Sequence, residues 1–308
     1  MLAILALIIS NLIWGAAPPV FKYALDGIPP FTLAFVRFFS AGLIFLPFAW
    51  QRRQSLSGFQ LRHISLAAFW GISVNVAFFF IGLKMSPSIN VHIISALAPL
   101  ILYFLSLRIL KEKPHPQIMK GMLVALLGVC IIVFAPLMRS GAFHSLAAEF
   151  SGLSIVLGNV FFIIAMFGSV LMTINNKQVL GKVDTIYVTC LEFFIGSIVF
   201  IPMMVRELST WSFTMLTFHG WVGIIFGIFF SSALAYFLLN FALSKMHAQE
   251  TGIYSYMLPV VAVLVAIPLL GEYPDWFFYV GALFVFSGLI MGQMHPHFHK
   301  VQKKARQR

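Results

Sequence analysis

The chain carries the stretch LKEKP at residues 110–114 and a matching stretch, LGEYP, at residues 270–274. A second block aligns Arg-Phe-Phe at residues 37–39 with Glu-Phe-Phe at residues 192–194, 155 positions later. The first pair of stretches sets a spacing of 160 residues, which also aligns Leu83 with Leu243, Ser95 with Ser255, Pro99 with Pro259, Gly121 with Gly281, and Gly128 with Gly288. The chain therefore repeats a unit of about 150 residues, and the two copies are expected to share one helix count.

The composition places both copies in a membrane. Sixty per cent of the 308 residues are hydrophobic and only 9% are charged, whereas a soluble domain carries about 25% charged residues. Runs of about 18 or more apolar residues are long enough to cross a bilayer as helices. The sequence contains ten such runs, at residues 2–22, 30–50, 63–83, 89–109, 117–137, 151–174, 185–204, 219–243, 250–270 and 276–294. Because they show no alternation of period two, we predict an all-α polytopic membrane protein with ten transmembrane helices.

The distribution of basic residues predicts how these helices are oriented. With the amino terminus in the cytoplasm, fifteen Lys and Arg residues fall on the cytoplasmic side and four on the outer side. The cytoplasmic group comprises Arg52, Arg53, Arg62, Arg108, Lys111, Lys113, Lys120, Lys177, Lys182, Lys245 and five residues between Lys300 and Arg308. This excess follows the positive-inside rule, so both termini are expected in the cytoplasm. Membrane topology and anionic lipid therefore account for the formal charge of +11, and no nucleic-acid partner is expected.

The number of runs in each copy predicts how the copies are related. Each copy contains five runs, an odd number, so the second copy enters the membrane from the opposite side and the repeats are inverted. Glu112 then lies at a cytoplasmic turn and its counterpart Glu272 at an outer turn, and both are expected to cap the helix that follows. We predict repeat one at residues 1–137, an external linker at 138–150, repeat two at 151–294 and a basic cytoplasmic tail at 295–308. Inverted repeats place a solute site near the bilayer midplane, where the halves meet.

Several motifs occur in a characteristic order: Trp14-Gly15 in the first run, Arg37-Phe38 in the second, SALAP at residues 95–99 in the fourth, and the two Glu-x-Pro turns. In this order they resemble the drug/metabolite transporter (DMT) superfamily, and the closest type is the EamA family. The resemblance covers almost the whole chain. It implies a bacterial inner-membrane exporter of amino acids, metabolites or drugs, with a central cavity between the first, third, fourth, sixth, eighth and ninth helices. In the second copy, Glu192 stands in place of Arg37, and Phe167-Gly168 stands in place of the Trp14-Gly15 pair.

Polar side chains within the runs are candidates for lining such a cavity, because a polar group that faces lipid is costly. In the eighth run, Ser232, Tyr236 and Asn240 follow at intervals of four residues and share one helical face. The predicted substrate-cavity residues are Asn11, Trp14, Asn75, His92, Ser95, Asn159, Tyr236, Asn240 and Ser255. The alternative is that these groups only form hydrogen bonds between helices, each worth about 1 kcal/mol.

Ionisable residues in or near the runs are candidates for coupling or gating. Arg37 and Glu192 occupy equivalent positions in the second and seventh runs, and either could bias two access states or simply anchor the fold with a buried partner. Glu250 lies near the start of the ninth run, where a helix dipole favours a carboxylate as a gate or as a cap. His92 titrates near neutral pH and is the candidate proton carrier, and its alternative role is in packing.

These features together favour a secondary transporter, an exporter that moves a small organic metabolite or drug-like solute by alternating access. No phosphate-binding loop of the G-x-x-x-x-G-K-S/T form occurs. The runs also contain no paired acid–base group or metal cluster, so we expect no catalytic residue, metal or cofactor. The histidines at positions 295, 297 and 299 are expected in a solvated tail. An intramembrane enzyme or a non-transporting scaffold are the alternatives. Expected partners are a small-molecule solute and membrane lipid, with protons as the candidate coupling ion, and the oligomeric state is left open.

Overall fold

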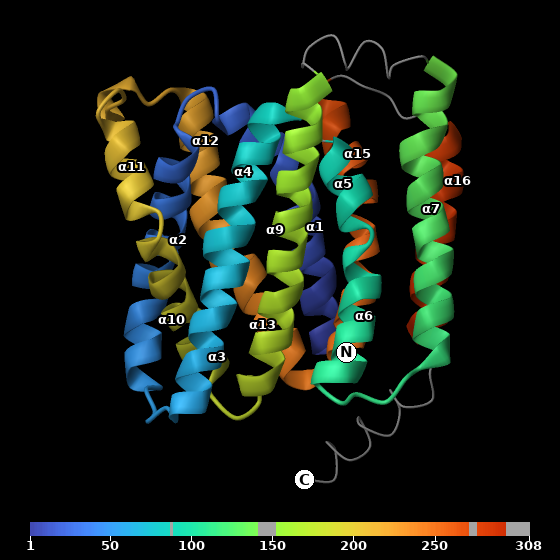
Figure 1. The fold of residues 1–308 in the computed structure, drawn as a ribbon, viewed down its shortest axis with the longest axis horizontal. Coiled ribbons are helices and arrows are strands. Elements are labelled where there is room, and N and C mark those ends of the chain that lie inside the picture. Colours follow the sequence, from blue (N-terminus) through green and yellow to red (C-terminus); the bar gives the residue numbers. More distant parts are fainter. Residues whose placement is uncertain (87–88, 141–151, 271–275, 294–308) are drawn as a thin grey trace.

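The computed structural model of the protein describes four stretches: residues 1–86, 89–140, 152–270 and 276–293. They fold into a bundle of helices (Figure 1). Within these stretches no strand forms, and only an isolated bridge joins Leu180 to Val183. Most of the expected linker, the expected tail and Glu272 lie outside the described residues. For the described part, the all-helical fold predicted from the sequence is confirmed.

Helical segments follow one another along the whole described chain. The first half forms α1 (Leu2–Ala24), α2 (Pro30–Gln51), α3 (Gly58–Ala68), the π-helical η1 (Phe69–Val74), α4 (Asn75–Met85), α5 (Ile89–Ser95), α6 (Ala98–Ile109) and α7 (Pro116–Ser140). The second half forms α9 (Gly152–Val179), α10 (Thr185–Ile198), α11 (Ile201–Leu208), the short η2 (Phe213–Met215), α12 (Phe218–Ile225), the π-helical η3 (Phe226–Leu234), α13 (Ala235–Lys245), α14 (Ala248–Gly252), the 3₁₀ segment η4 (Ile253–Tyr256), α15 (Met257–Leu270) and α16 (Trp276–Gln293).

Length and hydropathy identify the segments that can cross a membrane. Five continuous helical stretches qualify: Leu2–Ala24, Pro30–Gln51, Gly58–Met85, Leu153–Val179 and Phe218–Lys245. The pair of α10 and α11, bent by 49° at its break, would form a sixth span. Three further apolar helices are shorter: Ala98–Ile109, Pro116–Ile131 and Trp276–Gly292. The chain is a multi-pass integral membrane protein, and the count of ten spans stays a prediction.

Prolines explain why several runs expected as continuous helices are broken. The run at residues 89–109 forms two helices, because Pro99 occupies the second position of α6 and has no N–H to donate to the preceding turn. Pro202 stands at the same position of α11, just after the bend that ends α10. In the run at residues 250–270, the 3₁₀ segment η4 likewise comes shortly before Pro259. The apolar pattern predicted these helices, and the prolines set where they break.

Two π-helical segments occupy matching places in the two halves. η1 precedes the last six residues of η3 by 160 positions, which is the spacing of the sequence repeat. In a π-helical turn the backbone hydrogen bonds shift from the α-helical pattern. The carbonyl oxygen of Gly71 in η1 accepts a hydrogen bond from the Tyr236 hydroxyl, and that of Ser231 in η3 accepts one from Trp14 Nε1. Both segments therefore present a backbone acceptor to a side chain of another helix.

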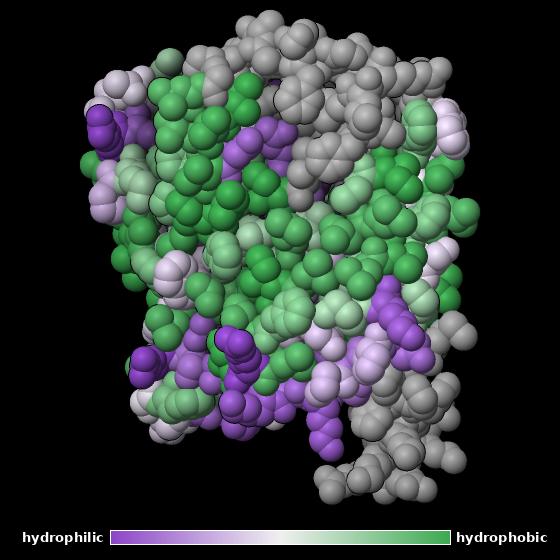
Figure 2. Space-filling model, turned by 45° about the vertical axis from the view of Figure 1, so that its right-hand side comes forward, coloured by the Kyte–Doolittle hydropathy of each residue, from purple (hydrophilic) through white to green (hydrophobic). Residues whose placement is uncertain are grey.

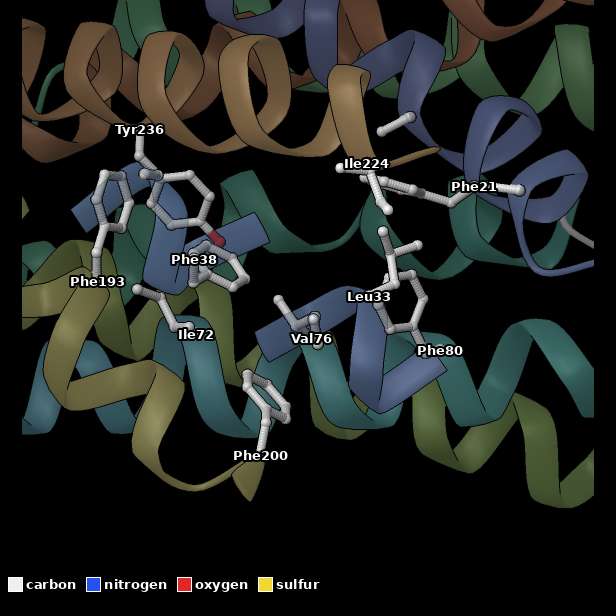
Figure 3. Packing of buried hydrophobic residues seen from close by; sticks show 14 of the residues in the cluster. Phe21, Leu33, Phe38, Ile72, Val76, Phe80, Phe193, Phe200, Ile224 and Tyr236 are labelled. Atoms are coloured by element: carbon white, nitrogen blue, oxygen red, sulfur yellow. The ribbon is translucent and has the colours of Figure 1, made fainter. Parts of the chain in front are cut away.

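A large aromatic cluster joins α2 to α10 and α13 (Figure 3). The ring of Phe38 packs edge to face on Tyr236, with 5.5 Å between centroids, and also contacts Phe193 at 5.9 Å. Phe39 contacts Phe194 at 5.6 Å. Aromatic pairs of this kind contribute about 0.5–1.5 kcal/mol each beyond the burial of their area. Phe38 and Phe39 are the residues that the repeat aligns with Phe193 and Phe194, so α2 and α10 pack equivalent side chains against each other.

Glycines bring α7 and α16 into close antiparallel contact. A Cβ atom on Gly121 would lie 2.5 Å from the carbonyl oxygen of Gly288, and one on Gly128 would lie 2.5 Å from that of Gly281. Small residues of this kind permit close approach of membrane helices. The contacts are reciprocal, because the repeat aligns Gly121 with Gly281 and Gly128 with Gly288. Gly121 therefore contacts the counterpart of Gly128, and Gly128 contacts the counterpart of Gly121.

The two ends of the bundle differ in polarity. The α2–α3, α6–α7 and α9–α10 connections lie at the lower end in Figure 1, where Arg52 contacts Asp184 at 3.4 Å. Figure 2 shows a broad hydrophobic band on the visible face and hydrophilic residues gathered most densely at the lower end. At the upper end, the Glu207 carboxylate accepts hydrogen bonds from the backbone N–H groups of Phe31 and Thr32, at the start of α2. A hydrophobic band between two polar ends is the surface that a bilayer requires.

Candidate functional site

A cavity of about 230 Å³ lies among helices from both halves of the chain. Its walls come from α1, α2, η1 with α4, α5 with α6, α9, η3 with α13, and α14 with η4 and α15. All of these segments except α2 fall in the six runs that the family resemblance implies as cavity helices. The exception, α2, adds Arg37 to the wall. The cavity is lined by eight of the residues singled out in the sequence: Asn11, Trp14, Arg37, Asn75, His92, Ser95, Tyr236 and Ser255.

Trp14 and Tyr236 form an aromatic pair in the cavity wall. Their rings meet edge to face, with centroids 5.2 Å apart and an interplanar angle of 83°. Trp14 Nε1 donates to the carbonyl oxygen of Ser231 at 3.1 Å, and the Tyr236 hydroxyl donates to that of Gly71 at 3.2 Å. Because both polar tips are bonded to π-helical segments, the rings are held in place and can offer their apolar surface to a ligand.

Arg37 is a buried cation in the same wall, with 4% of its surface exposed. Its Nε donates to Ser232 Oγ at 3.0 Å, and its Nη2 donates to Ser231 Oγ at 3.1 Å. The guanidinium carbon lies 4.6 Å from the ring centroid of Phe21 and 4.5 Å from that of Phe38. Both rings, shown in Figure 3, stabilise the positive charge through cation–π interactions.

Two asparagines of the cavity wall are tied to backbone carbonyl groups. Asn11 is buried, and its Nδ2 donates to the carbonyl oxygen of Leu7 at 2.8 Å within α1. Asn75 Nδ2 donates to the carbonyl oxygen of Ala165 at 2.7 Å, which joins α4 to α9. Each side chain therefore has a fixed orientation at the cavity.

The break between α5 and α6 contributes His92 and Ser95 to the cavity. The His92 side chain is 9% exposed and makes no hydrogen bond with any residue that the structure describes. Ser95 and its repeat counterpart in sequence, Ser255 of η4, both line the cavity. Matching positions of the two copies thus contribute to one cavity.

Asn240 and Glu192 lie in a separate buried cluster and do not line the cavity. Asn240 Nδ2 donates to Glu192 Oε2 at 2.8 Å and to Thr189 Oγ1 at 3.0 Å. Asn176 Nδ2 donates to Asn240 Oδ1 at 2.9 Å. Glu192 Oε1 and Asn176 Oδ1 are buried without a hydrogen-bond partner among the described residues. The cluster joins α9, α10 and α13, and any role in coupling remains a prediction.

Asn159 and Glu250 also lie away from the cavity wall. Asn159 Oδ1 accepts hydrogen bonds from Ser86 Oγ at 2.9 Å and from Asn90 Nδ2 at 2.8 Å, which joins α9 to the end of α4 and to α5. Glu250 Oε2 accepts from the backbone N–H of His247 at 3.0 Å and forms a capping box at the start of α14. This geometry is that of a helix cap, and a gating role for Glu250 is untested.

A second cavity, of about 610 Å³, lies at the lower end of the bundle. Its charged lining residues are Lys111, Glu112, Lys113, Lys177, Lys182 and, when protonated, His115 and His247. Among the described lining residues, lysines outnumber the single carboxylate, which favours a positive potential in this cavity. It is therefore suited to attract anions.

Glu112 links the α6–α7 connection to the start of α14, rather than capping α7 as the sequence suggested. Its carboxylate accepts from the backbone N–H groups of Ala248 at 2.8 Å and Gln249 at 3.3 Å, and it lies 3.4 Å from His247 Nδ1. Burial acts to raise the pKa of Glu112, but the hydrogen bonds from His247 and these N–H groups outweigh it and bring the pKa below 4.5. The hydrogen bond to Glu112 raises the pKa of His247 above 6.5, against the effect of burial.

Several polar residues of the cavity wall were not singled out in the sequence. They are Ser169 and Thr173 on α9, Ser231 in η3 and Thr251 on α14. Ser169 and Thr173 lie four positions apart within an apolar run, so the spacing used for the eighth run could have found them. The hydroxyl of Thr251 donates to the carbonyl oxygen of Ala248.

The chemistry of the cavity is that of binding. Amides, hydroxyls, aromatic rings and one guanidinium line it, which suits hydrogen bonding and stacking with a small molecule. Among the described residues, no group of three or more His, Cys, Asp or Glu side chains is placed to hold a metal. None of the described residues of the cavity wall is a carboxylate that would pair with His92 for acid–base catalysis.

Comparison with known proteins gives a consistent result. The profile of the EamA-like transporter family matches residues 1–134 and 156–292. An uncharacterized transporter of Archaeoglobus fulgidus is 25% identical over 297 residues, covering 95% of this chain and 98% of the relative. The uncharacterized transporter YetK of Bacillus subtilis is 23% identical over 293 residues, covering 94% of this chain and 86% of the relative.

A solved structure has the same fold. The crystal structure of this second protein superposes on the chain with a TM-score of 0.74 at 17% sequence identity. The superposition covers 95% of the present chain and 97% of the second protein. At that identity the likeness supports the fold alone, while the family profile matches most of the chain. The resemblance to the EamA type of the DMT superfamily is confirmed: the chain belongs to the EamA-like transporter family and is a membrane transporter rather than an enzyme.

Proposed function

We propose that the protein is a secondary transporter that exports a small organic metabolite or drug-like solute by alternating access across a bacterial inner membrane. The cavity of about 230 Å³ carries this proposal, because it gathers polar and aromatic side chains from both halves of the chain. Such a lining suits an amphipathic molecule held by hydrogen bonds and ring contacts. Movement of one half against the other would open this cavity to each side in turn.

The proposed architecture has ten spans in two inverted repeats, residues 1–137 and 151–294. The reciprocal glycine contacts of α7 and α16 support it, because a two-fold axis in the membrane plane brings each residue against the counterpart of its neighbour. The matching positions of η1 and η3, and the pairing of equivalent rings between α2 and α10, support the same relation. Five of the spans then consist of two or three helical segments each.

The proposed orientation places the lower end of the bundle in the cytoplasm. The second cavity at that end is lined by Lys111, Lys113, Lys177 and Lys182, and basic residues concentrate on the cytoplasmic side of membrane proteins. The amino terminus lies towards the same end (Figure 1). Both termini are proposed to be cytoplasmic. For the carboxyl-terminal tail, the proposal rests on the basic residues of its sequence.

Flux measurements in proteoliposomes test the cavity. We expect Trp14→Ala to lower the flux of a transported solute about tenfold, because the loss of an aromatic contact costs about 0.5–1.5 kcal/mol beyond its buried area. A screen of radiolabelled amino acids and organic acids for uptake by counterflow would first identify the solute. The matched control is Trp221→Ala, which removes a ring that is 53% exposed on the outer surface and should leave flux unchanged.

The two tryptophan variants separate the possible outcomes. Equal flux for wild type and Trp14→Ala would remove the ring from the binding site. Equal losses in both variants would point to a general effect on folding. If the folded wild-type protein moved no solute of the panel, the scaffold alternative would be favoured over the carrier.

The proposed energy source is the proton gradient or the gradient of the solute itself. Within the cavity wall, His92 is the candidate proton carrier, because an imidazole can accept and release a proton. If it couples transport to protons, His92→Gln should abolish the dependence of flux on an imposed pH gradient but leave downhill exchange intact. An unchanged dependence on the gradient in His92→Gln would reject this role. Arg37, Glu192 and Glu250 are then the remaining candidates for coupling or gating.

A further inference from the structure

The charge of the cavity wall bears on the class of solute. Of its lining residues, Arg37 carries a permanent positive charge and His92 is titratable, and none of the described lining residues is acidic. Arginine stays protonated in proteins. A solute that enters this cavity therefore meets a fixed positive charge without a neighbouring carboxylate to neutralise it.

Arg37 keeps part of its hydrogen-bonding capacity unused. Guanidinium has five N–H donors, and in the described structure only Nε and one N–H of Nη2 are engaged, by Ser232 and Ser231. No carboxylate among the described residues lies within ion-pair distance of Arg37. Nη1 and the second N–H of Nη2 form the end of the fork that binds a carboxylate through two parallel bonds.

The surroundings of Arg37 hold this fork in position. Phe21 and Phe38 flank the guanidinium at 4.6 and 4.5 Å. Gly227 packs on the aliphatic part, where an added Cβ would lie 3.1 Å from Arg37 Cβ. The rings and the serine hydroxyls restrict the side chain, so Arg37 loses little additional conformational freedom when a ligand binds to it.

Glu192, the buried carboxylate at the equivalent position of the second repeat, is engaged elsewhere. Glu192 accepts a hydrogen bond from Asn240 and does not line the cavity. A buried cation without a direct counter-ion is costly, and an anionic ligand would supply that counter-ion.

We propose that Arg37 binds the carboxylate of the transported solute, so that the cargo is a small organic carboxylate or a zwitterion such as an amino acid. This inference rests on the proposed transport function and names its substrate class. One guanidinium balances one negative charge, which favours a carboxylate over a phosphate dianion. Trp14, Tyr236 and Phe79 line the same cavity and would contact the apolar part of the solute. A volume of about 230 Å³ is below the roughly 300–1,000 Å³ of drug-sized sites and suits a smaller molecule.

The second cavity supports the same class of cargo from an independent position. Of the lining residues that the structure describes, four are lysines, Lys111, Lys113, Lys177 and Lys182, and one is a carboxylate, Glu112. Clefts lined by one sign of charge raise the local concentration of the opposite ion. At the proposed cytoplasmic end, this cavity would concentrate an organic anion before export.

Binding to the purified protein tests the proposal directly. The probes are carboxylates and their matched primary amides: hexanoate, phenylacetate, 2-oxobutyrate and L-phenylalanine, each against its amide. The readout is the ligand-induced rise in the melting temperature of the detergent-solubilised protein. We expect at least one carboxylate to bind about tenfold or more tightly than its amide, because the amide loses the charge-assisted bonds. Amides that bind as tightly as their carboxylates, or a panel without any carboxylate binder, would overturn the proposal.

Variants of Arg37 separate binding from anchoring. Arg37→Gln should remove the preference for the carboxylate, and Arg37→Lys should keep part of it, because lysine retains the charge but not the fork. The control Arg206→Gln alters an exposed arginine of α11 and should keep wild-type binding. If Arg37→Gln folds and still prefers the carboxylate, Arg37 only anchors α2 to η3. If it does not fold, the comparison of carboxylate with amide on the wild-type protein still decides.

The proposal and the transport function can fail separately. Flux of neutral amides equal to that of carboxylates in proteoliposomes would keep the carrier and reject the anion site. If carboxylates bind in a way that depends on Arg37 but no bound solute is transported, the proposed anion site is supported and the proposed transport function is rejected.

Discussion

A single buried carboxylate, Glu192, offers the sharpest test at the scale of residues. Its Oε2 accepts from Asn240, while its Oε1 has no partner among the described residues. Glutamine keeps an acceptor for Asn240 and removes a charge that is costly to bury. We therefore expect Glu192→Gln to be at least as stable as the wild type. Glu192→Ala removes the acceptor of the Asn240 Nδ2 hydrogen bond and should lower the free energy of unfolding by about 1–3 kcal/mol.

Thermal unfolding of the solubilised protein, followed by tryptophan fluorescence, measures both Glu192 variants. The alanine variant serves as the internal control, because it removes the same charge and also removes the acceptor. If glutamine destabilised the protein as much as alanine, the negative charge itself would be required by the fold. That outcome would favour a role for Glu192 in balancing the charge of Arg37.

The placement of polar residues shows how far the sequence predicts a site. Tyr236 lines the cavity as the helical spacing suggested, yet Asn240, one turn beyond Tyr236 on α13, does not. Spacing indicates which residues share a helical face, but it does not show which neighbours cover that face. At Asn240, side chains of α9 and α10 close over it through Asn176 and Glu192. Such contacts between distant segments leave no periodic signal in the sequence.

The contact between the α6–α7 connection and α14 gives a prediction at the scale of elements. Because the folded-state pKa of His247 is raised above 6.5, its stabilising contribution is complete below pH 6.5 and is lost as the pH rises through the raised value. Because the pKa of Glu112 is lowered below 4.5, its contribution is complete above pH 4.5 and is lost as the pH falls through the lowered value. The contact should be strongest between these limits, with both groups charged.

The melting temperature of the solubilised protein as a function of pH checks this contact. The wild type should lose stability as the pH rises above 6.5, because a histidine with a raised pKa deprotonates there. In His247→Gln this part of the pH dependence should disappear. Glu112→Gln should remove it as well, since the partner charge is gone. A loss of stability that persisted unchanged in both variants would assign the pH dependence to another group.

Elements were predicted better than the contacts between them. Apolar runs of sufficient length indicated most of the helices, because hydropathy is a property of the local sequence. The prolines at 99 and 202 also carried the signal for the breaks that follow Ser95 and Ile198, since proline removes a backbone donor. Glu112 was expected to cap a nearby helix, but it bonds to Ala248, 136 residues away. The helix dipole favours a carboxylate at the start of α7 and equally at the start of α14. The sequence around Glu112 does not show which of these two helices it contacts.

The inverted arrangement of the two repeats is a prediction for the whole molecule, and labelling of single cysteines tests it. With Cys130 and Cys190 replaced by alanine, a cysteine is placed at Lys113 or at Tyr273, its counterpart 160 positions later. Lys113 is exposed at the lower end, and Tyr273 lies outside the described residues. An impermeant thiol reagent added to intact cells should modify Tyr273→Cys alone, and Lys113→Cys should react only after permeabilisation.

Two further positions calibrate the reagent. Lys182→Cys lies in the exposed α9–α10 connection at the lower end and should behave like Lys113→Cys. Ser212→Cys lies in the exposed segment before α12 at the upper end and should react in intact cells. Since inversion requires the counterparts at 113 and 273 to face opposite sides, reaction of both from one side would reject it. The two-fold contacts of α7 and α16 would then need another origin, and the cavity could not be opened to its two sides by equivalent motions of the repeats.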